Sequence, residues 1–153
     1  MSAERYSIDT NILVYAVDRR EGDKHLRALD IVDRSVDLDC VLTGQSLAEL
    51  VVVATRRRKL SKPHAIAQAR DWRSLFPVVT ASARTFDAAL GAFEAGRFGL
   101  WDALLLATAC EAGCTTLLSE DMQDGAALDG IAVRNPLLVG ELPDDLRPLL
   151  GMA

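Results

Sequence analysis

Short apolar runs alternate along this chain with longer segments in which apolar residues recur every three or four positions. The short runs are typical of buried strands, and the longer segments are typical of helices with one apolar face. The strands that this pattern predicts cover residues 5–9, 40–43, 77–80, 115–118 and 132–134. The predicted helices cover residues 11–17, 23–34, 45–59, 61–75, 82–95 and 100–112. The residues after 140 show no clear pattern.

The order of these elements predicts an α/β fold, because strands and helices alternate and the sheet should then be largely parallel. In the helix over 23–34, the apolar face would consist of Leu26, Leu29, Ile31 and Val32. Ser61 would cap the helix over 61–75, with Pro63 in its first turn. The chain has 153 residues and no internal repeat or linker, so we expect one domain over residues 1–153.

The net charge of −5 argues against a surface that is basic overall. One basic cluster stands out at Arg56, Arg57, Arg58 and Lys59. Two interpretations are open, because cations are favoured near a helix C-terminus and because such a cluster can bind nucleic acid phosphates. The charge therefore does not exclude a nucleic-acid enzyme.

The three cysteines, Cys40, Cys110 and Cys114, have no spacing typical of a disulfide framework or a zinc site. A reduced, cytoplasmic protein is therefore expected. The segment from Met1 to Arg5 lacks the apolar stretch of a signal peptide. No apolar run approaches the length that spans a membrane, so no membrane partner is expected.

Four acidic residues stand where the surrounding pattern is apolar. Asp9 ends the first predicted strand, and Asp121 follows the strand over 115–118. Glu49 and Asp102 interrupt apolar helices, and the Leu and Trp neighbours of Asp102 predict a dry environment for it. A binding crevice in an open parallel sheet lies outside the carboxyl ends of the strands, which is where Asp9 and Asp121 are expected.

A buried carboxylate is costly unless a cation or a metal pairs with it. No Lys or Arg lies close in sequence to Glu49 or Asp102. Four acids from four separate elements suggest one shared partner, and a hard divalent cation held by oxygen ligands is the simplest. Metal-assisted hydrolysis is therefore the chemistry that the sequence indicates.

Each acid also has a structural interpretation. Asp9 could cap the helix that follows it, and Asp102 could complement the positive end of its own helix. Glu49 could close a capping box with Ser46, unless Thr43 is the cap, in which case no box forms. Its helix is apolar nearly all round, which predicts burial on two sides.

Asp121 has two acidic neighbours that could replace it as a ligand, Glu120 and Asp124. Asp124 is followed by Gly125, and this pair is more typical of a turn.

Five motifs resemble the PIN domain, in particular the VapC-type ribonuclease toxins of bacterial toxin–antitoxin pairs. They are IDTNILVYA at 8–16, QSLAEL at 45–50, LWDALLLA at 100–107, LLSEDMQDG at 117–125 and VRNP at 133–136. Together they cover roughly residues 5–137 in the expected order, and as a set they are specific.

The resemblance implies an α/β/α sandwich with a central parallel β-sheet, a Mg²⁺ or Mn²⁺ site and cleavage of RNA. It implies that the acidic quartet is Asp9, Glu49, Asp102 and Asp121, acting both as catalytic and as metal-binding residues. Thr10, Asn11 and Ser119 would be supporting polar residues, whereas Asp124 is not required by the pattern. A cognate antitoxin and a homodimer are the partners that it implies.

Alternatives to this function remain. An aspartyl phosphatase would use Asp9 as nucleophile, but phosphatases of the haloacid-dehalogenase type need an Asp where this chain has Asn11. A non-catalytic PIN-like domain would bind RNA or a partner only, and the intact quartet argues against it. A histidine-based ribonuclease is not expected, because His25 and His64 are far in sequence from the acids and are predicted to lie on the surface.

Overall fold

The computed structural model describes residues 4–153, so the first three residues of the N-terminal segment considered above lie outside it. The strands are β1 (Tyr6–Ile8), β2 (Leu42–Thr43), β3 (Val78–Val79), β4 (Thr116–Leu118), β5 (Ala127–Leu128) and β6 (Ile131–Arg134). The α-helices are α1 (Thr10–Val17), α2 (Asp23–Ser35), α3 (Gly44–Arg56), α4 (Lys62–Leu75), α5 (Ala83–Glu94) and α6 (Leu100–Glu111). Short 3-10 helices are η1 (Arg19–Glu21), η2 (Asp144–Leu146) and η3 (Pro148–Leu150).

The strands form a mostly parallel sheet at the centre of the molecule. β1, β4, β6 and β5 pair in that order, and only the β5–β6 pair is antiparallel. β2 and β3 form a separate parallel pair, and a parallel bridge between Tyr6 and Cys40 joins this pair to β1. The predicted α/β fold with a largely parallel sheet is therefore confirmed.

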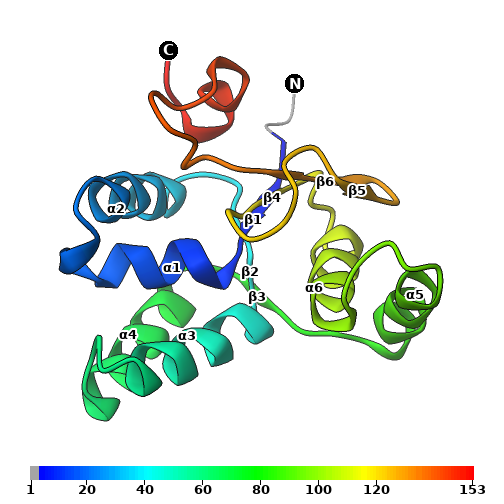
Figure 1. The fold of residues 1–153 in the computed structure, drawn as a ribbon, viewed down its shortest axis with the longest axis horizontal. Helices are drawn as coiled ribbons and strands as arrows, with labels where there is room; N and C mark the ends of the chain where they lie inside the picture. The colour runs from blue at the N-terminus through cyan, green and yellow to red at the C-terminus, as the bar shows by residue number, and fades with distance from the viewer. Residues whose placement is uncertain (1–3) are drawn as a thin grey trace.

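Helices cover both faces of the sheet, as Figure 1 shows with α1 to α4 on one side and α5 and α6 on the other. Neighbouring strand residues point to opposite faces. Leu118 accordingly packs in the core cluster under α1, α2 and α3, whereas Leu117 packs in the cluster under α5 and α6. This three-layer arrangement is the α/β/α sandwich that the resemblance implied.

Local sequence signals explain the helix starts. Thr43 caps α3 by accepting a hydrogen bond from the Ser46 amide, so the alternative without a capping box at Glu49 is confirmed. Ser61 caps α4 with Pro63 in its first turn, as predicted. Ser82 caps α5 through a reciprocal hydrogen-bond pair with Thr85.

Several expectations are wrong in detail. The helix predicted to reach residue 59 ends at Arg56, because Arg58 is left-handed (φ 53°) and the Lys59 and Leu60 amides both donate to the Ala54 carbonyl. Leu26 is 62% exposed and does not belong to the buried face of α2.

The pattern also missed ordered parts of the chain. β5 is only two residues long, too short to produce an alternating pattern, and it forms the antiparallel edge of the sheet. The segment after residue 140 contains η2 and η3, and their Leu146 and Leu150 side chains are buried in the core cluster that contains α2. Within residues 4–153, no helix is both long and apolar enough to cross a membrane.

Candidate functional site

Asp9 and Ser119 lie side by side because two neighbouring parallel strands end there. Ile8 of β1 is in register with Leu118 of β4, so the next residues, Asp9 and Ser119, follow at the same edge of the sheet. The Asp9 amide donates to the Leu118 carbonyl at 2.9 Å. The Ser119 hydroxyl donates to Oδ2 of Asp9 at 2.8 Å. Asp9 is therefore fixed at the carboxyl ends of the strands, as the sequence pattern predicted.

Asp9 is also the N-cap of α1. Its Oδ1 accepts from the Thr10 amide at 2.7 Å, whereas its Oδ2 accepts from Nδ2 of Asn11 at 3.1 Å and from Ser119. The capping interpretation is thus confirmed, but capping uses one oxygen only. The second oxygen faces polar partners across the end of the sheet.

Asn11 and Ser119 support this end of the sheet together. Nδ2 of Asn11 donates to the Ser119 hydroxyl at 3.2 Å, and Oδ1 of Asn11 accepts from the Glu120 amide at 3.0 Å. The Ser119 hydroxyl also accepts from the Asp121 amide at 3.2 Å. The loop that carries Asp121 is in this way tied to α1.

Glu49 reaches the same region from α3. Its Oε2 accepts from the Thr10 hydroxyl at 3.0 Å, and its Oε1 accepts from Nε2 of Gln45 at 3.1 Å. Gln45 also donates to the Trp101 carbonyl at 3.1 Å, which links α3 to the first turn of α6. Glu49 is half-buried and Val52 is half-exposed, so the expected burial of this helix on two sides is wrong.

Asp102 lies in the first turn of α6 and is exposed. The expectation of a dry environment is wrong, because Trp101 points its ring into solvent with 67% of its surface exposed. Partial desolvation of the carboxyl still raises the pKa of Asp102, and the nearby Asp121 and Glu49 carboxylates raise it further.

Glu120, Asp121 and Asp124 each have different surroundings. Glu120 accepts from the Tyr15 hydroxyl at 2.8 Å and forms an ion pair with Lys24. Asp124 accepts from the Asn135 amide at 2.7 Å, pairs with Arg134 and lies in a turn with Gly125, as predicted. Asp121 is exposed and has no ion-pair partner within residues 4–153.

One cavity of about 270 Å³ brings the four predicted acids together. Its lining includes Asp9, Glu49, Asp102 and Asp121 with Thr10 and Asn11. We call this space the acid cavity. Among the described residues, no Lys or Arg side chain forms an ion pair with any of these four acids.

The lining also contains residues that were not predicted to belong to the site, namely Val14, Tyr15, Glu21 and Val53. Tyr15 lies on α1, and Glu21 lies on η1, which follows α1 after the turn at Asp18. A polar residue at a helix end carries no distinct sequence signal, which is why they were missed. Of the basic cluster, Arg57 and Lys59 line the cavity, whereas Arg56 and Arg58 do not.

Asp9 is the most buried of the four acids, with 6% of its surface exposed. Burial raises the pKa of Asp9 to about 6, although hydrogen bonds from Ser119 and Thr10 work in the opposite direction. The Asp121 and Asp102 carboxylates add a smaller upward effect. No cation among the described residues pairs with Asp9, so its charged form is less favoured than that of a carboxylate in water.

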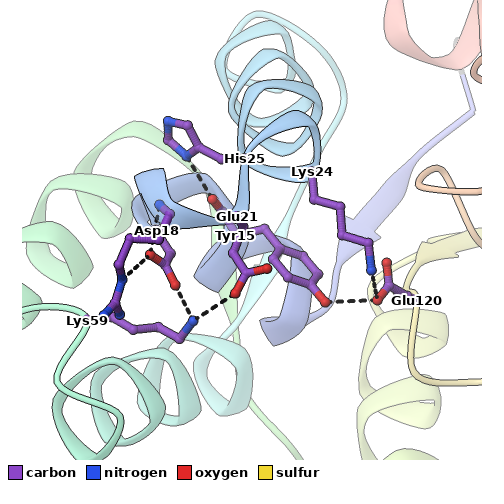
Figure 2. A network of polar contacts seen from close by, with 8 residues as sticks. Tyr15, Asp18, Glu21, Lys24, His25, Lys59 and Glu120 are labelled. Atoms are coloured by element: carbon purple, nitrogen blue, oxygen red, sulfur yellow. Dashed lines mark hydrogen bonds and ion pairs between the residues drawn. The ribbon is translucent and has the colours of Figure 1, made fainter.

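A polar network borders the acid cavity, and Figure 2 shows it between α1, η1 and the α3–α4 loop. The Lys59 ammonium forms ion pairs with Asp18 and Glu21, and its side chain is only 9% exposed. On the other side of the network, the Tyr15 hydroxyl and Lys24 both bond Glu120. The Lys24 ammonium lies 5.1 Å from the centre of the Tyr15 ring.

The residues fit a hard divalent cation by their chemistry, because all four acids offer carboxylate oxygens and none is already neutralised by an ion pair. Within residues 4–153, however, no three Asp, Glu, His or Cys side chains stand in an arrangement that could hold a metal ion. The carboxylates of Asp9 and Glu49 instead accept hydrogen bonds from neighbouring side chains. Binding of an ion would require these side chains to turn toward one another.

A larger cavity of about 900 Å³ lies beyond the Asp18–Lys59 pair and contains none of the four acids. His25 and His64 both line it. His64 is exposed as predicted, whereas His25 is half-buried with its Nδ1 2.9 Å from the Tyr15 carbonyl. Neither histidine lines the acid cavity.

A sequence model described as the PIN domain matches residues 6–123. No curated protein is found to match the chain.

Solved structures share the fold at low sequence identity. One is VapC20 from Mycobacterium tuberculosis, a toxin described as cleaving the sarcin–ricin loop, with a TM-score of 0.63 and 16% identity over 76% of this chain and 89% of that chain. Another is a toxin–antitoxin complex from Klebsiella pneumoniae, with a TM-score of 0.60 and 21% identity over 83% of this chain and 95% of that chain. A third is VapBC2 from Rickettsia felis bound to a DNA fragment from their promoter, with a TM-score of 0.60 and 18% identity over 85% and 97% of the two chains.

Proposed function

The chain belongs to the PIN domain family, and from this premise we propose that it is a metal-dependent endoribonuclease that acts as the toxin of a toxin–antitoxin pair. Its substrate would be single-stranded or structured RNA, and its cofactor Mg²⁺ or Mn²⁺. The observation that carries the proposal is the acid cavity, in which Asp9, Glu49, Asp102 and Asp121 meet without an ion-pair partner among the described residues.

In this mechanism Asp9 and Asp102 would hold the cation, and Glu49 and Asp121 would hold a second ion or orient water. A divalent cation supplies Lewis-acid activation of water and neutralises the charge that develops on the phosphate. Ser119, Asn11 and Thr10 donate hydrogen bonds to Asp9 and Glu49 and so keep both carboxylates at the cavity, from where they would turn toward the ion. Water would then attack in line and leave a 5′-phosphate and a 3′-hydroxyl.

The test is incubation of the purified protein with RNA, with and without EDTA, beside the variant Asp9→Asn. We expect cleavage by the wild type in Mg²⁺ or Mn²⁺, no cleavage in EDTA and none by the variant. Analysis of the new ends separates the mechanisms, since 2′,3′-cyclic phosphate ends or full activity in EDTA would exclude metal-activated water.

The surroundings of Asn11 bear on the phosphatase alternative. A haloacid-dehalogenase phosphatase needs an acid at this position, but here the Asn11 amide donates to Asp9 and Ser119 and accepts from the Glu120 backbone. These three bonds use both ends of an amide, and a carboxylate could not donate the first two. The position therefore serves to support Asp9.

An antitoxin would inhibit the enzyme by inserting a basic side chain at Asp9 and Asp102, where an Arg or Lys could replace the cation. Support for such a partner comes from the fold shared with chains of toxin–antitoxin complexes. Co-expression with the protein encoded next door tests this, and a neighbour that neither binds nor relieves growth arrest would leave a free-standing nuclease. We also propose a homodimer, which would bury exposed apolar side chains of α5.

A further inference from the structure

Two cationic side chains line the acid cavity, and they differ in what they bind. Lys59 is nearly buried, and the Asp18 and Glu21 carboxylates compensate its charge. Arg57 is exposed, and its side chain forms no ion pair or hydrogen bond with any residue between 4 and 153. Arg57 is therefore the cation of the acid cavity that is available to a ligand.

Arg57 directly follows α3 as its C-cap, and this position aligns it with the acids. Glu49, Val53 and Arg57 are spaced four residues apart, so Arg57 continues the face of α3 that carries Glu49 and Val53, and all three line the cavity. Eight residues of helix span about 12 Å along its axis. Arg57 thus stands at one end of the cavity, on the same helix face as Glu49 but two turns further along.

The backbone that carries Arg57 is held firmly. The Arg57 amide donates to the Val53 carbonyl at 3.0 Å, and the Lys59 and Leu60 amides both donate to the Ala54 carbonyl. The ion pairs of Lys59 then fasten this turn to the segment of Asp18 and Glu21, as Figure 2 shows. Lys59 is in this sense a positioning residue, which fixes the end of α3 without offering a free charge.

An RNA strand that enters the acid cavity brings phosphates toward several carboxylates, which repel it. A cation beside the reacting phosphate would offset that repulsion, and a guanidinium can pair with a phosphate through two parallel hydrogen bonds. We propose that Arg57 binds an RNA phosphate next to the scissile one, and that this contact sets the path of the strand across the cavity. The inference rests on the proposed ribonuclease function and assigns one of its substrate contacts.

The test measures binding of a labelled random-sequence pool of single-stranded RNA to the full chain in Mg²⁺, in an Asp102→Asn background that prevents cleavage. Arg57→Ala is expected to weaken binding roughly tenfold or more, the effect of one charge-assisted contact. The slope of log K against log salt should become shallower by about 0.7, as expected for one phosphate contact on a single strand. Arg56→Ala removes the same charge one residue earlier and should leave affinity within about twofold, because the Arg56 side chain does not line the cavity that the strand would cross.

Arg57→Lys separates a phosphate contact from other roles, since it keeps the charge but loses the paired geometry. It should retain the salt slope while binding more weakly than Arg57. If Arg57→Ala and Arg56→Ala bind RNA equally well, or if the lysine variant loses as much slope as the alanine variant, the proposal is overturned. A shift in the metal-free melting temperature without a change in RNA affinity would also overturn it, because Arg57 would then only compensate the acids.

Cleavage by the wild-type chain, assayed in parallel, separates this inference from the function on which it rests. Cleavage without an Arg57 effect on binding overturns the inference and leaves the nuclease intact. Binding that depends on Arg57 without any cleavage keeps the RNA contact and overturns the nuclease. A chain that neither binds nor cleaves the RNA pool overturns both.

Discussion

Asp9 should determine how the metal-free protein responds to mild acid. In the unfolded chain its carboxyl titrates near 3.8, whereas in the folded protein burial raises its pKa to about 6. Between these values the folded state holds a proton that the unfolded state has lost, so stability falls as pH rises from about 4 to 6. Two pKa units correspond to about 3 kcal/mol.

The measurement is urea unfolding of the metal-free wild type and of Asp9→Asn between pH 4 and pH 7. The wild type should lose stability across this range relative to the variant, and saturating Mg²⁺ should reduce the loss. Asp18 does not interfere, because hydrogen bonds from Lys59 and Arg20 outweigh its burial and hold its pKa at about 2, so its contribution changes at lower pH. Parallel pH profiles for the two proteins would contradict the assignment.

Asp102→Asn is expected to abolish RNA cleavage while leaving the metal-free protein as stable as the wild type or slightly more so. The neighbouring Asp121 and Glu49 carboxylates raise the pKa of Asp102, so neutralising it relieves repulsion, and its exposure keeps the effect small. Thermal melts in EDTA and a cleavage assay test the two halves. Asp33→Asn, an exposed acid on α2 outside the cavity, is the control that should keep full activity. A large loss of stability in Asp102→Asn would indicate a structural residue.

For individual residues, the sequence predicted which acidic groups belong to the site but not how exposed they are. Asp9, Glu49, Asp102 and Asp121 could be singled out because a charge inside an apolar run is visible in one dimension, and all four line one cavity. Their exposure could not be predicted, because a run such as LWDALLLA does not say which side of the helix is covered. Asp102 and Trp101 face outward for this reason.

Among the elements, the end of α3 depends on a buried ion pair. Asp18 is 3% exposed and Lys59 is 9% exposed, and together they join the α3–α4 loop to the end of α1. Removing one partner leaves the other charge buried, which costs about 3 kcal/mol in comparable pairs. Lys59→Met should therefore lower the free energy of unfolding by about that amount.

Urea unfolding at neutral pH measures this loss. Arg56→Met makes the same change on an exposed residue of α3 and should have little effect. The double variant Asp18→Asn, Lys59→Met should recover part of the loss, since the unpaired carboxylate is removed. Equal effects of Lys59→Met and Arg56→Met would show that the ion pair contributes little.

Element positions followed from sequence where a cap or an apolar period was present, as at Ser61 and Ser82. The predicted ends of elements were wrong where tertiary contacts determine the observed ends. Nothing local marks Lys59 as the partner of Asp18, 41 residues away, so the basic cluster looked like one continuous helix end. β5 was missed because its two residues form a strand only by pairing with β6.

For the molecule as a whole, the order of strands and helices was enough to predict an α/β fold with a largely parallel sheet, whereas the three layers were implied by the resemblance. The place of surplus apolar surface could not be predicted in this way. Residues 47–54 and 100–109 are apolar on more than one side of a helix, a pattern that is compatible both with burial and with apolar surface left for a partner. Most of α6 is enclosed between α5 and the sheet, with Ala103, Leu106 and Ala109 fully buried.

Three of the exposed large apolar residues lie together on α5. Phe86, Leu90 and Phe93 are spaced by four and three residues, so they share one face of this helix, and all three are exposed. An apolar stripe of this kind is typical of a surface that binds a partner. The proposed homodimer would bury it against a second copy of the chain, since the stripe carries no charge to select another partner.

Light scattering across micromolar concentrations tests the dimer. The wild type should be dimeric, and the double variant Phe86→Ser, Phe93→Ser should be monomeric, because truncating two aromatic anchors weakens an interface by about a hundredfold or more. Leu26→Ser is the control: this leucine on α2 is more exposed than the stripe residues but lies outside the stripe, and its loss should leave the dimer intact. A strictly monomeric wild type would refute the dimer. A dimer that survives the double variant would place the interface elsewhere than on α5.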